Sequence, residues 1–272
     1  MPENNQNERS RPIQKLRRAG RGLLDPARRK KGIYILPNLF TTAALFSGFY
    51  AIVNGMNGQF QTACIAIFIA MVLDGLDGRV ARMTHTQSEF GAQFDSLADM
   101  VSFGAAPALV MYEWALKPMG KWGWAGAFIY CACAALRLAR FNTNIEVVDK
   151  RFFQGLPSPA AAAVVAGMIW VLSQHFAVNE VRYFAWGITV LAGVTMITNI
   201  KYYSGKEINL RGTVPFWVIP LIFLGYLIVT IEPSHVLWGL FLCYLLSGYV
   251  LGIISWFKPD PPAPSQPPTA IK

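Results

Sequence analysis

Residues 61–82 read QTACIAIFIAMVLDGLDGRVAR, a mostly apolar run that passes into two aspartates and two arginines. A stretch of this length can cross a bilayer, because a hydrocarbon core of ~30 Å needs about 20 helical residues. Seven further apolar stretches of comparable length occur, at 34–54, 95–115, 124–141, 158–175, 183–199, 214–231 and 236–257. The sequence therefore predicts an all-α, polytopic membrane protein with about eight spans.

The composition of the whole chain supports this interpretation. Of its 272 residues, 54% are hydrophobic and 14% are charged, whereas an ordinary soluble domain carries roughly 25% charged residues. This balance excludes a disordered chain, a collagen and a coiled coil. The four cysteines lie inside apolar runs, so we interpret them as buried apolar residues rather than as a disulfide framework.

The basic residues set the expected orientation. Residues 1–32 contain ten Lys and Arg against three acidic residues, which supplies +7 of the net charge of +9. With this arm in the cytoplasm, 21 of the 24 basic residues fall on that side, and only Lys117, Lys121 and Arg182 fall outside. We expect both termini in the cytoplasm and the arm, in part an interfacial helix, on anionic lipid. The arm lacks interleaved aromatic residues, so we expect no nucleic-acid binding.

Four aspartates lie where the second and third predicted spans meet the cytoplasm. Asp74 and Asp77 are spaced i, i+3 and Asp95 and Asp99 are spaced i, i+4, so each pair shares a helix face. The connection 83–90 is short and polar, which predicts an antiparallel hairpin that brings the four carboxylates together. Ionisable groups at membrane depth cost a few kcal/mol each and persist mostly at functional sites. Four close anions need cations, and oxygen ligands suit Mg²⁺, Mn²⁺ or Ca²⁺.

Small residues and an arginine accompany these aspartates. Gly78 and Ala81 lie near Asp77 on the same predicted helix and would leave space for a ligand against its surface. Arg82 follows one turn later and can offer a fork of donors to a phosphate. Together with the metals, this pattern indicates a site for a nucleotide diphosphate whose pyrophosphate oxygens are bridged by divalent ions.

The aspartates and small residues form one motif, which reads Asp74-x-x-Asp77-Gly78-x-x-Ala81-Arg82, eight residues, then Gly91-x-x-x-Asp95-x-x-x-Asp99. It resembles the signature of the CDP-alcohol phosphatidyltransferases at every signature position. The resemblance implies a six-helix transmembrane core, a homodimer and an active site near the cytoplasmic face. It also implies transfer of a phosphatidyl group from CDP-diacylglycerol to an alcohol, with release of CMP.

The resemblance further implies roles for single residues. Asp74, Asp77 and Asp95 match metal-ligand positions for two Mg²⁺ or Mn²⁺ ions. Asp99 matches the general base and is counted among the metal ligands as well. The residues that match or join the CDP-facing positions are Asp74, Gly78, Ala81, Arg82 and Asn38. Asn38 has an alternative role, which is to cap the first predicted helix.

Four further stretches are similar to bacterial phosphatidylserine synthases within this family: 37–41 (PNLFT), 101–108 (VSFGAAPA), 136–142 (LRLARFN) and 152–161 (FFQGLPSPAA). This similarity implies L-serine as the acceptor. Arg137 and Arg140 share a face at the cytoplasmic end of the fourth span, and we expect them, with Ser102, to bind serine. Ser158 is a further polar candidate at this depth. Each arginine has an alternative role as an interface residue that extends its charge to water.

The resemblance covers roughly residues 33–200, which gives the expected organisation of the chain. A basic cytoplasmic arm (1–32) precedes a six-span catalytic core (33–200), two additional spans (201–257) and a Pro-rich disordered tail (258–272). The expected location is the bacterial inner membrane, with the active site on the cytoplasmic side.

Two alternatives stay open. The acceptor can instead be glycerol 3-phosphate or an inositol phosphate, because the arginines near the cytoplasmic mouth do not decide its identity. A cation transporter also fits eight spans with intramembrane acids. Transporters usually place their coupling sites near the midplane, whereas these aspartates lie toward one end of two spans.

Overall fold

A computed structural model describes residues 26–84, 86, 88–143, 152–203 and 218–257. The described residues form eight helical rods, as the eight apolar stretches predict. Six of the rods are single helices: α2 (Pro26–Met56), α3 (Phe60–Thr84), α6 (Lys121–Thr143), α7 (Ser158–His175), α8 (Val178–Ile197) and α10 (Pro233–Phe257). A seventh rod is the shorter helix α9 (Val218–Ile231). The eighth, a composite rod, consists of several consecutive helical segments, of which α4 (Glu89–Asp99) is the first. The all-α prediction is confirmed.

The composite rod runs from Glu89 to Met119 without a break in the chain of helical turns. After α4 it continues through the π-helical turn η2 (Met100–Ala105), α5 (Ala106–Met111), the π-helical turn η3 (Tyr112–Leu116) and the 3₁₀ turn η4 (Lys117–Met119). Ser88 caps its start, because its hydroxyl accepts a hydrogen bond from the Gly91 amide at 3.0 Å.

The π-helical turn η2 begins directly after Asp99. Pro107 lacks an N–H, so in a regular α-helix the carbonyl of Phe103 would have no backbone donor. The hydroxyl of Tyr130 on α6 donates to this carbonyl at 3.1 Å instead. Single π-turns are common near functional sites, and this one directly follows Asp99.

Helix α7 is the centre of the bundle. Its run from Ala160 to Leu172 is buried all round, with α3, α5, α8 and α10 packed against it. Small side chains allow these helices to come close. At Gly167 an added Cβ would lie 3.0 Å from Cβ of Trp238 on α10, so this contact requires a residue without a side chain.

Two three-residue strands join the ends of the core helices, and the apolar pattern did not predict them. β1 (Phe152–Gln154) pairs antiparallel with β2 (Lys201–Tyr203), and Phe152 lies opposite Tyr203. Gly155 follows β1 with φ +76°, a left-handed conformation that favours glycine, and its amide donates to the carbonyl of Ile200 at 2.9 Å. Strands this short leave little periodic signal in a sequence.

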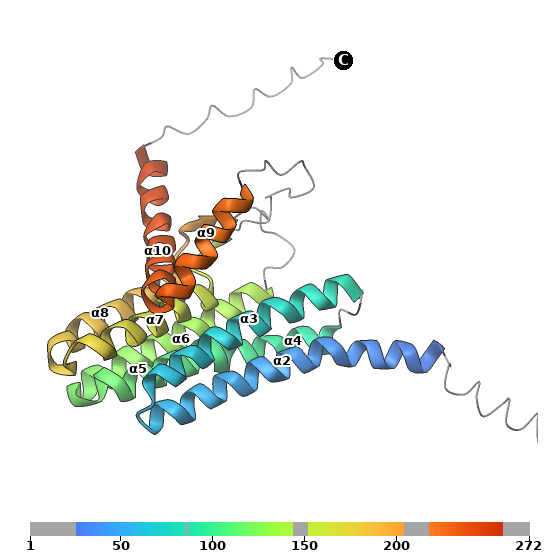
Figure 1. Cartoon of the computed structure of the whole chain (residues 1–272), viewed down its shortest axis with the longest axis horizontal. Helices are drawn as coiled ribbons and strands as arrows, with labels where there is room; N and C mark the ends of the chain where they lie inside the picture. The colour runs from blue at the N-terminus through green and yellow to red at the C-terminus, as the bar shows by residue number, and fades with distance from the viewer. Residues whose placement is uncertain (1–25, 85, 87, 144–151, 204–217, 258–272) are drawn as a thin grey trace, which may run out of the picture.

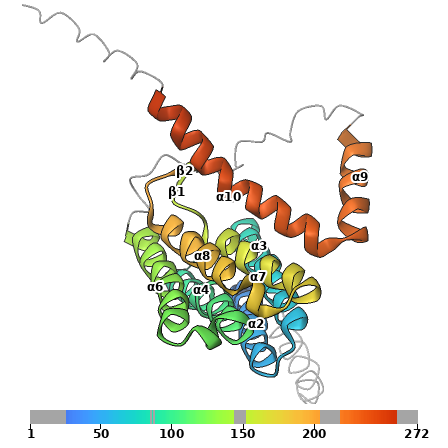
Figure 2. The ribbon, with the colours of Figure 1, turned by 90° about the vertical axis from the view of Figure 1, so that its left-hand side faces the viewer.

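The arrangement of the rods is shown in two views. In Figure 1 the core helices run along one direction, with α9 and α10 on one side of them. Figure 2 looks along the core and shows α10 crossing over α7 and α8. Asn142, near the C-terminal end of α6, donates to the hydroxyl of Ser96 on α4 at 3.0 Å, so the aspartates of α4 lie at that end of the bundle.

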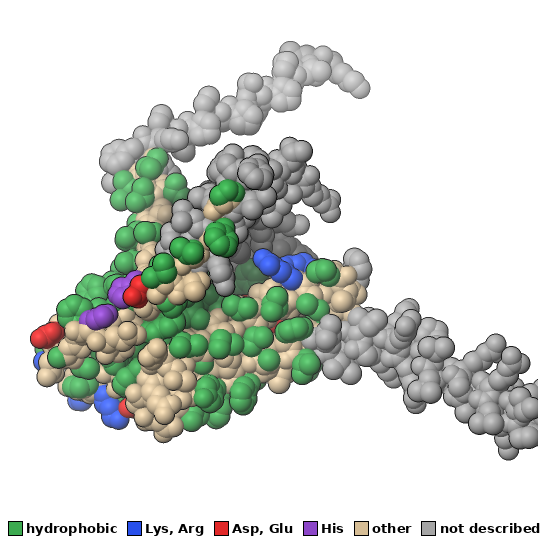
Figure 3. Space-filling model, in the orientation of Figure 1, with side chains coloured by type: hydrophobic (Ala, Val, Ile, Leu, Met, Phe, Trp, Pro, Cys, Tyr) green, Lys and Arg blue, Asp and Glu red, His purple; other side chains and the backbone are tan. Residues whose placement is uncertain are grey.

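Four helices of the described residues are long and apolar enough to cross a membrane, namely 37–56, 89–119, 121–143 and 233–254. Their outer faces carry many apolar side chains, and Figure 3 shows hydrophobic groups scattered widely over the face in view, with only a few charged groups among them. A multi-pass membrane protein is therefore confirmed, while the number of crossings stays a prediction. The tail 258–272 and most of the basic arm (1–25) lie outside the described residues.

Candidate active site

Three carboxylates from two helices converge at one end of the core. Asp74 on α3 and Asp95 and Asp99 on α4 each offer an oxygen, and these oxygens lie within 4.8 Å of one another. The negative charges of Asp74 and Asp95 both act unfavourably on an ionised Asp99, so these carboxylates repel one another unless a cation lies among them. The antiparallel hairpin predicted from the sequence therefore brings these three residues together.

Asp95 carries the clearest sign of a cation-binding site. Its Oδ1 atom is buried and has no hydrogen-bond partner among the described residues. Asp95 also experiences repulsion from both Asp74 and Asp77. A divalent cation among these oxygens would satisfy the orphaned atom and cancel the repulsion, so the residues fit a hard metal ion with oxygen ligands.

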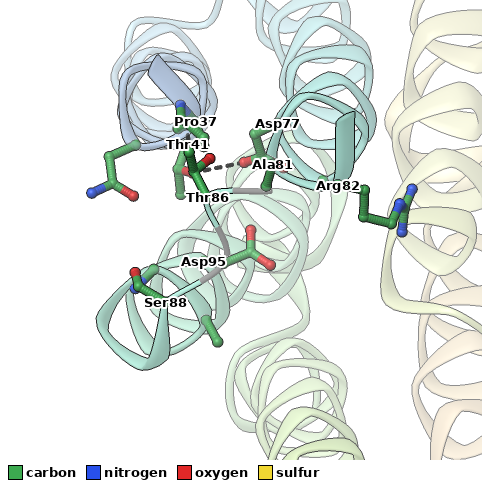
Figure 4. Close-up of a pocket in the computed structure, with 12 residues that line it drawn as sticks. Pro37, Thr41, Asp77, Ala81, Arg82, Thr86, Ser88 and Asp95 are labelled. Carbon is green, nitrogen blue, oxygen red and sulfur yellow. Dashed lines mark hydrogen bonds between the residues drawn. The ribbon is translucent and has the colours of Figure 1, made fainter. Parts of the chain in front are cut away.

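Asp77 lies beside this cluster in a different environment. It is 4% exposed, and the hydroxyl of Thr41 on α2 donates to its Oδ2 atom at 2.7 Å. The same hydroxyl lies 3.2 Å from the carbonyl of Pro37, but its single proton is best used on the closer, charged acceptor. Figure 4 shows this hydrogen bond joining the two helices. Asp77 is thus held in one orientation by α2.

A cavity of about 290 Å³ opens beside Asp77 and Asp95. Its walls come from α2, the end of α3 and the start of α4, and its lining residues are Pro37, Asn38, Thr41, Asp77, Gly78, Ala81, Arg82, Thr86, Ser88, Gly91, Ala92 and Asp95. The predicted CDP-facing residues Asn38, Gly78, Ala81 and Arg82 all line it. Asp74 does not; it lies with Asp95 and Asp99.

Glycine keeps part of this cavity open. An added Cβ at Gly78 would meet nothing within 4 Å, so the helix surface there is bare. At Gly91 a Cβ would lie 3.0 Å from the hydroxyl of Ser88 and 3.5 Å from the amide oxygen of Asn38. The side chain of Arg82 extends away from Asp77 and Asp95 in Figure 4. A side chain larger than hydrogen at Gly78 would occupy space that a ligand can use.

Arg137 lies at the inner side of the aspartates. Its Nη1 atom donates to the hydroxyl of Ser158 at 2.6 Å, and its charge acts on Asp99. Its Nε atom is buried without a hydrogen-bond partner among the described residues. A cation close to the carboxylate cluster, with an unused donor, is suited to a small anionic group such as a carboxylate.

Arg140 and Ser102, the other two residues predicted to bind the acceptor, form hydrogen bonds within the protein instead. Arg140 donates to the carbonyl of Ile197 at 3.3 Å, to Gln154 at 2.7 Å and to Asn199 at 2.6 Å. It therefore ties α6 to the end of α8 and to β1. Ser102 is 1% exposed, and its hydroxyl donates at 3.1 Å to the carbonyl of Ala44 on α2.

Sequence reasoning did not identify the role of Thr41 or the partnership of Arg137 with Ser158. Thr41 lies in the stretch PNLFT, three residues after Asn38, and this spacing places both on one helix face. The spacing of Thr41 from Asn38 could therefore have predicted that Thr41 also faces the site. The contact between Arg137 and Ser158 joins α6 to α7 and has no local pattern in the sequence.

Comparison with known proteins agrees with this site. A sequence model described as CDP-alcohol phosphatidyltransferase matches residues 34–198. A Helicobacter pylori protein named CDP-diacylglycerol–serine O-phosphatidyltransferase is 38% identical over 226 residues, which cover 82% of this chain and 92% of that protein.

Two further proteins of the same name match shorter parts of the chain. A Methanocaldococcus jannaschii protein is 36% identical over 151 residues, covering 56% of this chain and 68% of its own. A Saccharomyces cerevisiae protein is 35% identical over 152 residues, covering 51% of this chain and 54% of its own. The similarity thus extends across bacteria, an archaeon and a yeast.

Proposed function

Because this chain belongs to the CDP-alcohol phosphatidyltransferase family, we propose that it transfers the phosphatidyl group of CDP-diacylglycerol to L-serine, giving phosphatidylserine and CMP. The observation that carries the proposal is the carboxylate cluster of Asp74, Asp95 and Asp99 beside the cavity, with its orphaned Asp95 oxygen. Family membership also favours this transfer over the transporter alternative.

Asp74, Asp95 and Asp99 would hold two Mg²⁺ or Mn²⁺ ions together with Asp77. When bound, these ions supply positive charge to the pyrophosphate oxygens and to the leaving phosphate. The orphaned Oδ1 of Asp95 and the convergence of the three carboxylates to within 4.8 Å support this assignment. Thr41 would fix the orientation of the Asp77 carboxylate.

The cavity would receive the CDP head group, with the pyrophosphate toward Asp77 and Asp95 and the nucleoside against Gly78 and Ala81. The acyl chains would stay in the lipid. Arg82, at the cavity wall, would turn toward a phosphate when the substrate binds. Asn38 would contact the nucleotide from α2, since it lines the cavity and lies beside Gly91.

The chemical step uses Asp99 as the base. Asp99 takes the proton of the serine hydroxyl, and the serine oxygen bonds to the phosphorus that carries diacylglycerol. The bond from that phosphorus to the bridging oxygen breaks, and the electron pair leaves with CMP. Positioning and charge stabilisation supply most of the rate, as in other phosphoryl transfers.

Arg137 would bind the serine carboxylate with the donors that Ser158 does not use. An acceptor that carries a phosphate would need several cations, and Arg140 already donates to three protein oxygens. Among the described residues close to Asp99, Arg137 is the cation whose charge acts on that carboxylate. One available cation suits the single carboxylate of serine better than the phosphate of glycerol 3-phosphate or of an inositol phosphate.

The setting of the enzyme belongs to the same proposal. We place both termini and the active site on the cytoplasmic side of the bacterial inner membrane, because the basic residues are concentrated in segments that share that side. The basic arm would bind anionic lipid. The apolar outer faces of the core helices leave room for a homodimer within the membrane.

The replacement Asp99→Asn tests the proposed base. The variant should lose serine-dependent CMP release, because the amide keeps the shape of the side chain but does not accept the proton. CDP-diacylglycerol binding should be affected less, because Asp74, Asp77 and Asp95 remain as metal ligands. Asp95→Asn, by contrast, should lose metal binding together with turnover. Turnover near the wild-type rate in Asp99→Asn would remove the general-base role.

A further inference from the structure

The N-terminal half of helix α10 packs against α7, although α10 lies outside the part of the chain that matches the family model, which ends at residue 198. An added Cβ at Gly167 on α7 would lie 3.0 Å from Cβ of Trp238 on α10. Phe68 on α3 packs against both helices, with its ring centre 6.0 Å from that of Trp170 and 6.4 Å from that of Phe241. These contacts hold the start of α10 beside the last turns of α7.

Two histidines meet where these two helix ends come together. His175 is the last residue of α7, and His235 lies in the first turn of α10. Their ring centres are 5.6 Å apart, and the rings are inclined at 41° to each other. Both side chains are exposed, and Figure 3 shows histidine side chains together on the face in view, with an acidic side chain beside them. The pair is therefore open to an ion from the surrounding water.

A carboxylate orients one of the two rings. Oε2 of Glu232 lies 3.3 Å from Nδ1 of His235, and Oγ of Ser234 lies 3.4 Å from the same nitrogen. With the proton on Nδ1, this nitrogen donates to the carboxylate, and Nε2 keeps its lone pair. Histidines that bind metals almost always donate their other N–H to a partner of this kind. His235 therefore has the surroundings of a metal ligand.

The separation of the two rings fits one ion between them. A Zn–N bond is ~2.0–2.1 Å long, so two imidazoles on one tetrahedral ion have ring centres about 5 Å apart. The observed 5.6 Å lies near this value, and both side chains can rotate because they are exposed. Among the described residues, only Asp74, Asp95 and Asp99 offer three ligand atoms within 4.8 Å of one another, so the histidine pair would supply two ligands and water the others.

We propose that His175 and His235 bind a transition-metal ion of the class of Zn²⁺, Ni²⁺ and Cu²⁺, with Glu232 as the carboxylate that orients His235. Imidazole suits these ions, whereas Mg²⁺ and Mn²⁺ prefer the oxygens of the aspartate cluster. Helix α7 begins at Ser158, the partner of Arg137, and is 18 residues long, so the histidines lie about 25 Å from the active-site end. The ion would join the end of α7 to the start of α10, and this role does not depend on the proposed function.

Calorimetric titration of the tag-free full chain in detergent with Zn²⁺, in an excess of Mg²⁺, tests the site. We expect His175→Gln and His235→Gln each to weaken Zn²⁺ binding about 100-fold and Glu232→Ala to weaken it about tenfold, since the loss of an orienting partner costs about 10–100-fold. Zn²⁺ should raise the thermal midpoint of the wild type but not of either histidine variant, because an ion that binds only the folded chain stabilises it. Without metal the midpoints should agree, because the replaced side chains are exposed.

Two control variants separate this site from other metal binding. The third histidine of the chain is His85, and His85→Gln should keep the wild-type Zn²⁺ affinity. Asp95→Asn removes a proposed ligand of the aspartate cluster and should keep that affinity too. Cu²⁺ on the wild type should show electron paramagnetic coupling to two imidazole nitrogens.

Three results would overturn the proposal. Wild-type Zn²⁺ affinity in His175→Gln or His235→Gln would show that the pair is not the site. An equal loss in His85→Gln or Asp95→Asn would place the Zn²⁺ elsewhere. No Zn²⁺ binding by the folded wild type would leave the contact between the two rings as packing alone.

Discussion

Replacing Thr41 with valine removes one hydroxyl from the site and little else. Valine has nearly the same shape as threonine, so the packing of α2 against α3 should be kept. The hydroxyl donates at 2.7 Å to Oδ2 of Asp77, a carboxylate that is only 4% exposed. Without it, this oxygen has lost a donor in a place that water hardly reaches, and the carboxylate is free to rotate.

The structure sets the size of the expected effect. A hydrogen bond to a charged group contributes roughly 1.5–3 kcal/mol, and the loss of a partner that orients a metal ligand typically weakens metal binding about 10–100-fold. We therefore expect Thr41→Val to raise the dissociation constant for Mn²⁺ by about one to two orders of magnitude. The thermal midpoint of the metal-free protein should also fall, because the buried Asp77 oxygen loses its hydrogen-bond donor.

Calorimetric titration of the purified protein with Mn²⁺ measures this directly, with CMP release as a second readout. Thr41→Ser is the matched control, since it keeps the hydroxyl and should bind Mn²⁺ nearly as the wild type does. The activity of Thr41→Val should recover in part at high Mn²⁺. Wild-type Mn²⁺ affinity in Thr41→Val would show that Asp77 needs no support from α2, or that Asp77 is not a ligand.

Three further predictions concern the same end of the bundle. Gly48→Ala would place a Cβ 2.5 Å from Oγ and 2.7 Å from Cα of Ser102, so it should push α2 from the π-helical turn and destabilise the fold by about 1–3 kcal/mol, measured as a lower thermal midpoint. Gly78→Ala should leave that midpoint unchanged, because its Cβ meets nothing within 4 Å, but it should weaken CDP binding by intruding on the cavity; unchanged CDP affinity would contradict the placement of the nucleotide. Removal of divalent ions with EDTA should abolish CMP release and Mg²⁺ or Mn²⁺ should restore it, whereas full activity after EDTA would exclude the metal assignment.

The apolar pattern predicted the helices well, because each helix of this bundle is a long apolar run. The predicted stretch 158–175 coincides with α7, which is buried on all sides and so carries no polar face to blur its ends. The third rod begins at Glu89, earlier than the expected 95, because its first turn is polar and capped by Ser88. Composition also does not reveal the π-helical turn after Asp99, which depends on Pro107 and Tyr130 together.

The site was predictable to the extent that its residues lie close in sequence. Helical spacing within 74–99 was enough to bring Asp74, Asp95 and Asp99 together, and the structure confirms that meeting. Contacts between distant helices were not predictable. The i, i+3 spacing placed Arg137 and Arg140 on one helix face and predicted one role for both. Arg140 instead donates to Gln154 of β1, a strand that the apolar pattern did not predict.

The most direct test of the central claim is CMP release by the purified protein in detergent with CDP-diacylglycerol and Mn²⁺ or Mg²⁺. Serine, glycerol 3-phosphate, an inositol phosphate and no acceptor are compared side by side, and the lipid product is identified. Our account predicts metal-dependent CMP release with serine alone, together with phosphatidylserine. Metal-dependent release with a different acceptor would contradict the serine assignment, and no release from folded, metal-loaded protein would contradict the transferase itself.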